Sequence, residues 1–121
     1  MSTLRGHHEI KIQTGYYSLY AVATVELEFV SGPSELRLRA PEGFWSPEPW
    51  RPGVQFGLAY AADRAREHRH TLTTVTLKAT AADSTPAVVA LAVARAALAA
   101  LGVTEEPLPT LVEQSVVFPA R

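Results

Sequence analysis

The clearest pattern along the chain is an alternation of apolar and polar positions between residues 19 and 29. Every second residue from Leu19 to Phe29 is apolar, and the residues between them are mostly polar. This period-two pattern predicts a strand with one buried face. Shorter alternations predict strands at 8–13 and 35–40, and Ser31-Gly32-Pro33-Ser34 predicts the turn before the third strand. We expect these three strands to form an antiparallel meander.

Two later segments carry apolar residues at helical spacing. The first helix is expected to begin at Pro52 and to close at residues 68–70, where cationic side chains suit a helix C-terminus. The second is expected to begin at Pro86, capped by Ser84 or Thr85, and to end at Gly102. Residues 71–79 are rich in β-branched side chains and predict a strand, and a last strand is expected at 115–118.

These elements follow one another in the order βββαβαβ. The order predicts an α+β fold, a two-layer α/β sandwich with a mostly antiparallel sheet and both helices on one face. A length of 121 residues suits one domain, so we expect a single domain over 1–121.

Composition narrows the classes of function. The chain has no cysteine, which excludes disulfides and thiolate metal sites, and its net charge of −1 shows no basic excess for nucleic acid. Its longest apolar stretch, 87–101, contains Arg95 and is too short to cross a bilayer. Residues 1–6 lack the apolar core of a signal peptide. We therefore expect a cytoplasmic protein that is not embedded in a membrane.

Several short motifs in order resemble domain IV of elongation factor G. The family pattern P-x-x-Y-x-P-x-V-x-x-G-I is matched by PEPWRPGVQFGL at 47–58. The family's V-T-L is matched by Val75-Thr76-Leu77. Its D-S-S-E is matched in part by residues 83–86, and its P-x-x-L-E-P in part by residues 109–114. The family's glycine-rich Q-T-G segment aligns with 13–21. The resemblance spans residues 8 to 118 and implies a fold like domain 2 of ribosomal protein S5, and a link to translation and the ribosome.

The chain departs from this family at the loops that work at the decoding centre. The loop G-G-R-G-Q is replaced by residues 15–19, which contain no arginine, and the loop Y-D-G-S-Y-H shrinks to residues 78–82, which contain no histidine. No G-x-x-x-x-G-K-[ST] sequence occurs, so we expect no GTP binding by this chain.

Residues suited to catalysis or metal binding have simpler interpretations. His68 and His70 lie at a helix end, where neighbouring side chains diverge, and Asp83 and Ser84 are better explained as cap residues than as parts of a triad with His70. We expect no catalytic residue, no metal and no cofactor.

Two surfaces could bind a partner. Arg37 and Arg39 lie on an outer sheet face, and Tyr16 and Tyr17 are close in sequence to Lys11, which is expected on the outer face of the neighbouring strand. These arginines and tyrosines are possible RNA contacts, although glutamates on the same face favour salt pairing. The second helix is apolar nearly all round, which favours an interface on the outer faces of the helices. The candidate residues of this interface are Phe56 and Tyr60 in the first helix and Ala90, Ala94 and Arg95 in the second.

Three hypotheses follow, in descending order. The first is a non-catalytic binding domain related to the translation-factor domain, which self-associates as a homo-oligomer or docks on a protein partner. The second is a ribosome- or RNA-associated module that uses the outer sheet face. The third is an enzyme of unknown type. An alanine-rich helix with no binding role is the alternative to the first, because alanine is also a good helix former.

Overall fold

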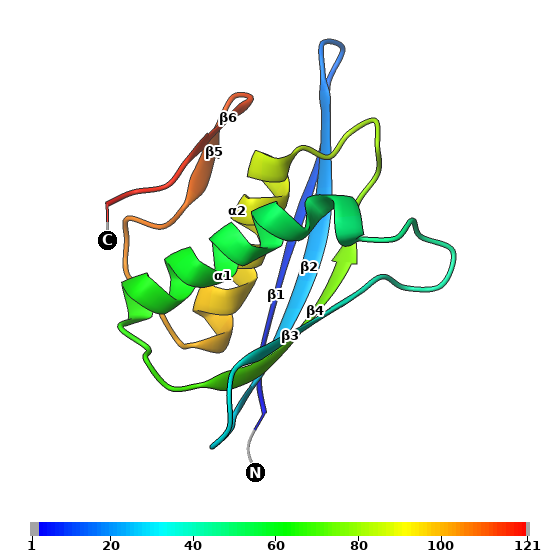
Figure 1. The fold of residues 1–121 in the computed structure, drawn as a ribbon. Helices are drawn as coiled ribbons and strands as arrows, with labels where there is room; N and C mark the ends of the chain where they lie inside the picture. The colour runs from blue at the N-terminus through cyan, green and yellow to red at the C-terminus, as the bar shows by residue number, and fades with distance from the viewer. Residues whose placement is uncertain (1–2, 121) are drawn as a thin grey trace.

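The computed structural model describes residues 3–120 (Figure 1). Residues 1, 2 and 121 of the expected domain lie outside the described residues. Four strands form one sheet in the order β1-β2-β4-β3, two more form a separate hairpin, and both helices lie on one face of the sheet (Figure 1). The elements are β1 (Leu4–Gln13), β2 (Ser18–Phe29), β3 (Glu35–Arg39), the 3-10 turn η1 (Glu48–Trp50), α1 (Arg51–Ala65), β4 (Thr71–Lys78), α2 (Pro86–Ala100), β5 (Thr110–Val112) and β6 (Ser115–Val117).

The first two strands form a long antiparallel hairpin that confirms the alternation in the sequence. Leu4 pairs with Leu27 at one end and Gln13 with Ser18 at the other. The odd-numbered apolar residues of β2 from 19 to 27 are buried against the helices, whereas its even-numbered positions point to the opposite face. At the tip, the Thr14 hydroxyl accepts hydrogen bonds from two backbone N–H groups and closes the turn. The strand predicted at 8–13 begins earlier, at Leu4.

The predicted meander is wrong at its third strand. β3 does not pair with β2; it pairs in parallel with β4, which lies between them. The inward residues of β4 suit this central place, because Thr73, Val75 and Leu77 are all buried. β3 has only five residues, half-buried at best, which suits an edge. The sheet is therefore mixed, with two antiparallel pairings and one parallel pairing.

The helix ends follow local chemistry. Thr85 caps α2, since its hydroxyl accepts the Val88 N–H at 3.1 Å, and Pro86 takes the first helical position as predicted. Gly102 follows the helix at φ +76, a left-handed conformation that glycine tolerates. α1 ends sooner than predicted, because Arg66 adopts a left-handed conformation at φ 55 and stops the helix. Residues 68–70 therefore lie beyond the helix rather than closing it.

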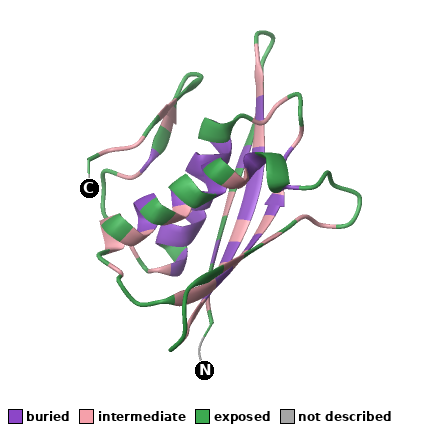
Figure 2. Cartoon of the chain, in the orientation of Figure 1, coloured by how far each residue is buried: buried purple, intermediate pink, exposed green. Residues whose placement is uncertain are grey.

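Helix α2 is the centre of the core (Figure 2). Eleven of its fifteen residues are buried, because it has β1 and β2 on one side and α1 on another. Glycines allow this close approach. A Cβ on Gly53 would lie 2.7 Å from the carbonyl oxygen of Pro86, and a Cβ on Gly6 would overlap that of Ala96.

The last predicted strand joins a hairpin and not the main sheet. β6 confirms a strand at 115–117, but it pairs with β5, which the sequence did not predict. Leu111 of β5 and Val116 of β6 pack against the core, so the hairpin lies beside α2 (Figure 1). In the described part of the chain, no helix is long and apolar enough to cross a membrane.

Candidate binding surface

Three of the five residues predicted at an outward helix interface are buried inside the chain. Tyr60, Ala90 and Ala94 are 2%, 3% and 0% exposed, which corrects their placement on an outer surface. The reason lies at Gly57, where an added Cβ would be 2.6 Å from the carbonyl oxygen of Ala90 and 3.0 Å from the nitrogen of Ala94. The alanines of α2 therefore form its contact with α1.

The C-terminal residues Phe118 and Pro119 pack on the two aromatic side chains of α1, Phe56 and Tyr60. The Phe118 ring lies 5.0 Å, centroid to centroid, from both Phe56 and Tyr60 in edge-to-face geometry. The Tyr60 hydroxyl also donates a hydrogen bond to the carbonyl oxygen of Pro119. Phe56 keeps 46% of its surface exposed. The apolar helix residues that favoured an outward interface are thus largely used for packing within the chain.

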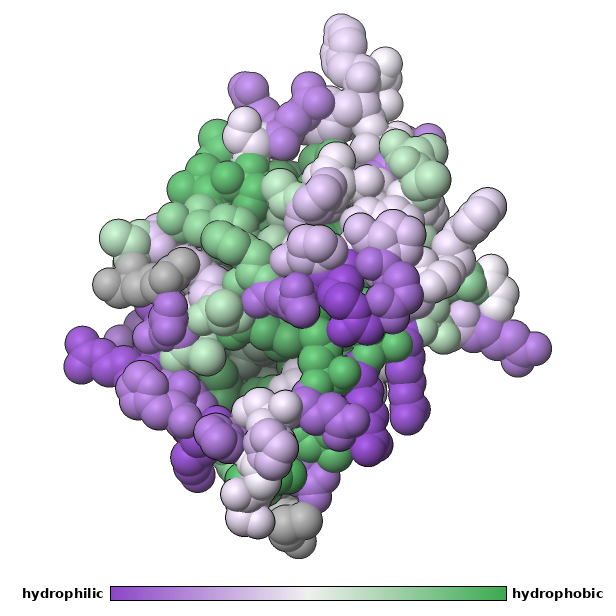
Figure 3. Space-filling model, viewed as in Figure 1, coloured by the Kyte–Doolittle hydropathy of each residue, from purple (hydrophilic) through white to green (hydrophobic). Residues whose placement is uncertain are grey.

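Apolar surface remains on the hairpin β5–β6. Val112 and Val117 are exposed, and Figure 3 shows hydrophobic atoms gathered at the upper left, where the hairpin lies. Their neighbours in the alternation, Leu111 and Val116, point inward. The hairpin therefore has apolar side chains on both faces.

The predicted RNA-contact residues do not meet. Tyr16 is 96% exposed at the tip of the β1–β2 hairpin, and the neighbouring Tyr17 is half-buried against the core. Arg37 and Arg39 lie on β3 at the opposite edge of the sheet from β1. In the strand register Arg39 is level with His7 of β1. From that level, about 20 Å of strand leads to the tip of the β1–β2 hairpin. The tyrosines and the arginines are therefore separate features.

The outer sheet face, opposite the helices, carries interleaved charges. Lys11 lies 3.7 Å from a carboxylate oxygen of Glu9, and Arg37 lies 3.6 Å from one of Glu35. His7 also approaches Glu9, at 3.4 Å, and together with Lys11 it lowers the pKa of that carboxyl below its ordinary value. The carboxylates neutralise part of the positive charge that a phosphate backbone would need.

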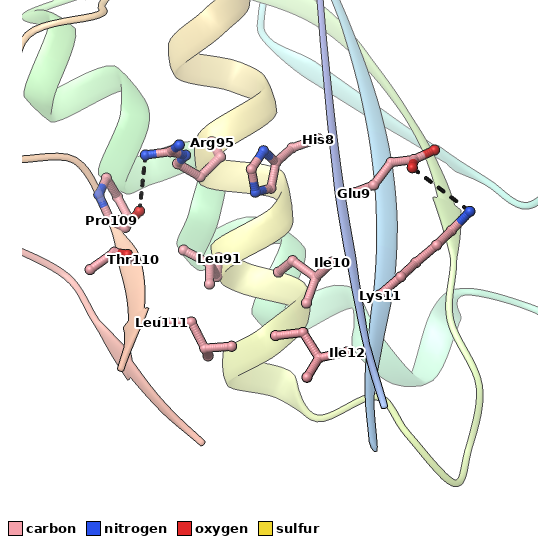
Figure 4. A pocket seen from close by; sticks show the side chains of 10 residues that line it. All are labelled: His8, Glu9, Ile10, Lys11, Ile12, Leu91, Arg95, Pro109, Thr110 and Leu111. Atoms are coloured by element: carbon pink, nitrogen blue, oxygen red, sulfur yellow. Dashed lines mark hydrogen bonds and ion pairs between the residues drawn. The ribbon is translucent and has the colours of Figure 1, made fainter. Parts of the chain in front are cut away.

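A groove of about 300 Å³ runs between β1 and the hairpin, with α2 as its floor (Figure 4). Ile10 and Ile12 of β1 point into it toward Leu91 of α2 and Leu111 of β5, whereas Glu9 and Lys11 point away (Figure 4). The apolar side chains thus come from three elements that are far apart in sequence. The full lining is His8, Glu9, Ile10, Lys11, Ile12, Leu91, Arg95, Pro109, Thr110 and Leu111.

Arg95 and His8 give one end of the groove its polarity. The Arg95 guanidinium donates to the carbonyl oxygen of Pro109 at 3.3 Å, which ties the C-terminal segment to α2. Burial, and then the nearby Arg95 charge, lower the pKa of His8 below its ordinary 6.5, so its ring is neutral at neutral pH. The groove therefore carries a cation at one end and an apolar stretch along the rest.

β1 is also a free edge. Within residues 3–120 it pairs only with β2, so one side of this ten-residue strand presents backbone N–H and C=O groups without strand partners. The groove lies along the inner face of that same strand, at residues 8–12. We call this combination of β1 edge and groove the edge site.

Asp83, Ser84 and His70, considered above as a catalytic triad, make hydrogen bonds with the backbone of other elements. The Ser84 hydroxyl donates to the Tyr20 carbonyl at 2.6 Å, and the Asp83 carbonyl accepts the Tyr20 N–H at 3.0 Å. His70 is within 2.8 Å of the Gly32 carbonyl oxygen, far from Ser84 in the fold. Among residues 3–120, no three histidine or carboxylate side chains gather in a group that could hold a metal ion.

The sequence interpretation missed the edge site because its parts lie far apart in the chain. β5 is only three residues long and follows two prolines, so it gave no strand signal. The two short runs of mostly β-branched and apolar residues at 110–112 and 115–117, separated by Glu113-Gln114, could have revealed the hairpin.

Comparison with known proteins shows the fold alone. No protein-family model matches the chain, and no curated protein is similar to it in sequence. In structure it is similar to a protein from Thermus thermophilus, with a TM-score of 0.62 and 18% sequence identity. The similarity covers 82% of this chain and 16% of the Thermus chain, so in that protein the shared fold makes up a small part of a longer chain.

Proposed function

We propose that this chain is a non-catalytic protein-binding domain, which engages an extended partner segment at the edge site. The observation that carries the proposal is a ten-residue strand with an open edge, flanked by a groove of about 300 Å³. Natural proteins usually shorten or cover such edges, because a long open edge pairs readily with another chain. Here the opposite edge, β3, is short, and the long edge is the open one.

The binding mode is strand addition. An extended segment beside β1 would pair its backbone with the open edge and send alternate side chains to the two faces of the sheet. Side chains on the helix side would enter the groove and meet Ile10, Leu91 and Leu111. Backbone pairing supplies affinity, and the groove selects apolar side chains.

The resemblance to domain IV of elongation factor G supports a domain that works by contact and not by chemistry. The motifs at 47–58 and 75–77 that carry the resemblance lie in α1, its preceding turn and β4, which are scaffold elements. The Thermus protein contains the same fold within a much longer chain. We infer a relation to that translation-factor domain, as a scaffold with a different working surface.

Selection of peptides from a random library displayed on phage tests the proposal. Ile12→Lys adds a charge inside the groove, and Gln13→Lys adds the same charge on the outer face, as a matched control. Peptides selected on the wild-type chain should bind Q13K equally and I12K at least about tenfold more weakly. Melting curves check that both variants fold. Peptides that bind I12K as tightly as wild type, or a library without binders, would contradict the proposal.

RNA binding by the outer sheet face is the second candidate. One observation favours it: Arg37 and Arg39 are exposed on a face that the helices leave open. Salt-dependent retention on RNA that disappears in R37E/R39E would support this candidate. Equal retention of the variant would reject it.

A further inference from the structure

We infer that the partner at the edge site is a second copy of this chain, paired β1 to β1 in antiparallel orientation about a two-fold axis through Ile10. This inference rests on the proposed function, because it requires the edge site to bind a strand. It adds the identity of the partner and the register of the pairing.

The outer face of β1 complements itself in this register. In an antiparallel pair centred on Ile10, Glu9 of each copy faces Lys11 of the other, so two opposite-charge pairs form across the axis. Both side chains are about half exposed in the single chain and already point to the same face. Seven residues of each strand, from His7 to Gln13, would be paired.

The neighbouring registers place like charges together. Centring the pair on Glu9 or on Lys11 puts that residue opposite its own copy, and centring on His8 puts Arg5 opposite Lys11 twice. A pair centred on His7 is free of that conflict, because it sets Arg5 against Glu9. That register also sets Leu4 against Ile10 on the inner face, but it sets His7 against itself and is centred away from the groove, whose lining on β1 runs from His8 to Ile12.

The inner face favours the Ile10 register as well. There Ile10 meets its own copy and Ile12 meets His8, whose ring is uncharged at neutral pH. The groove lining on β1 runs from His8 to Ile12, so the groove is centred on the same residue as the symmetry axis. The isoleucines of the second copy would enter a groove already lined by Leu91 and Leu111.

The arrangement closes on itself. A two-fold axis perpendicular to the sheet makes the contact isologous and joins two four-stranded sheets into one. The edges of the combined sheet would then be the two short β3 strands, each of five residues. The long edges are thus removed, as expected of a protein that avoids open-ended association.

Charge exchange tests both partner and register. The full-length wild type is compared with Glu9→Lys, Lys11→Glu and the double variant E9K/K11E by sedimentation equilibrium up to millimolar concentration. Wild type should show concentration-dependent dimer mass. Each single variant should weaken dimerisation at least about tenfold, and the double variant should restore it, because opposite charges again face each other. Melting temperatures confirm that all four proteins fold.

Three results would overturn the inference. The first is a wild type that stays at monomer mass at every concentration. The second is a double variant that dimerises as weakly as the single ones. The third is an unchanged dimer in Lys11→Glu, which would indicate the His7-centred register. None of these touches the peptide selection above, so failure of the dimer and failure of the edge site are distinguished.

Discussion

Replacing Gly6 with alanine tests how closely β1 is packed on α2. A Cβ at position 6 would overlap the carbonyl oxygen of Ala96 and would lie 2.7 Å from the nitrogen of Ala100. Both obstacles are backbone atoms in the later turns of a buried helix. They cannot rotate away as the end of a flexible side chain can, so the helix or the strand must shift.

The expected cost combines two opposing terms. Forcing extra atoms into a packed core costs about 1–3 kcal/mol, and the rigid obstacles at this site place the change at the upper end. Alanine recovers up to about 1 kcal/mol relative to glycine, because glycine loses more conformational freedom in a strand. We expect the free energy of unfolding to fall by about 2 kcal/mol. For a chain of 121 residues, that lowers Tm by roughly 8 °C.

Urea denaturation followed by circular dichroism measures the change. Gly15→Ala is the matched control, because nothing lies within 4 Å of a Cβ there and its backbone is not in the left-handed region. G15A should be neutral or slightly stabilising. If G6A matches or exceeds the stability of wild type, α2 does not pack on β1 as closely as described.

Three further outcomes follow from the structure. Tyr60→Phe removes the hydrogen bond to Pro119 and should cost about 1 kcal/mol and speed amide exchange after residue 115, as read by hydrogen-exchange mass spectrometry. Burial and Arg95 lower the pKa of His8, so as the pH falls the unfolded state binds a proton at this residue before the folded state does. The stabilisation should be fully present above pH 6.5 and should be lost as the pH falls below it. His8→Gln should flatten this loss, as measured by urea midpoints across the pH range. The neighbouring Arg69 lowers the pKa of Glu67 to about 2, so an NMR titration should find this carboxyl ionised well below pH 4.5. Its contribution to the free energy of unfolding is present above pH 4.5 and is lost as the pH falls through about 2.

The sequence predicted the elements well where a period was long and uninterrupted. The alternation at 19–29 became β2, and Thr85-Pro86 and Gly102 bounded α2. The order of strands was less accessible. Nothing local in residues 35–39 distinguishes a strand that follows β2 in a meander from one that pairs in parallel beyond β4. The difference depends on which strand lies between β2 and β3 in the sheet.

Surface residues were harder to predict, because their exposure depends on what packs over them. The sequence predicts Tyr60 on an outer face of α1, yet Phe118 and Pro119 cover it from the far end of the chain. Ala90 and Ala94 are predicted on an outward apolar face, but Gly57 lets α1 pack directly against them. The edge site combines β1, α2 and β5, so no single window of sequence could contain its signal.

Amide hydrogen exchange along β1 tests the central claim most directly, because it reports the open edge itself. The wild-type chain is compared at low concentration, where it is free, and at high concentration or with a selected peptide, where the edge site is occupied. The account predicts that protection rises in Leu4–Gln13 and stays unchanged in β3 at the opposite edge. Unchanged exchange along β1, or new protection confined to β3 or to the outer sheet face, would contradict it.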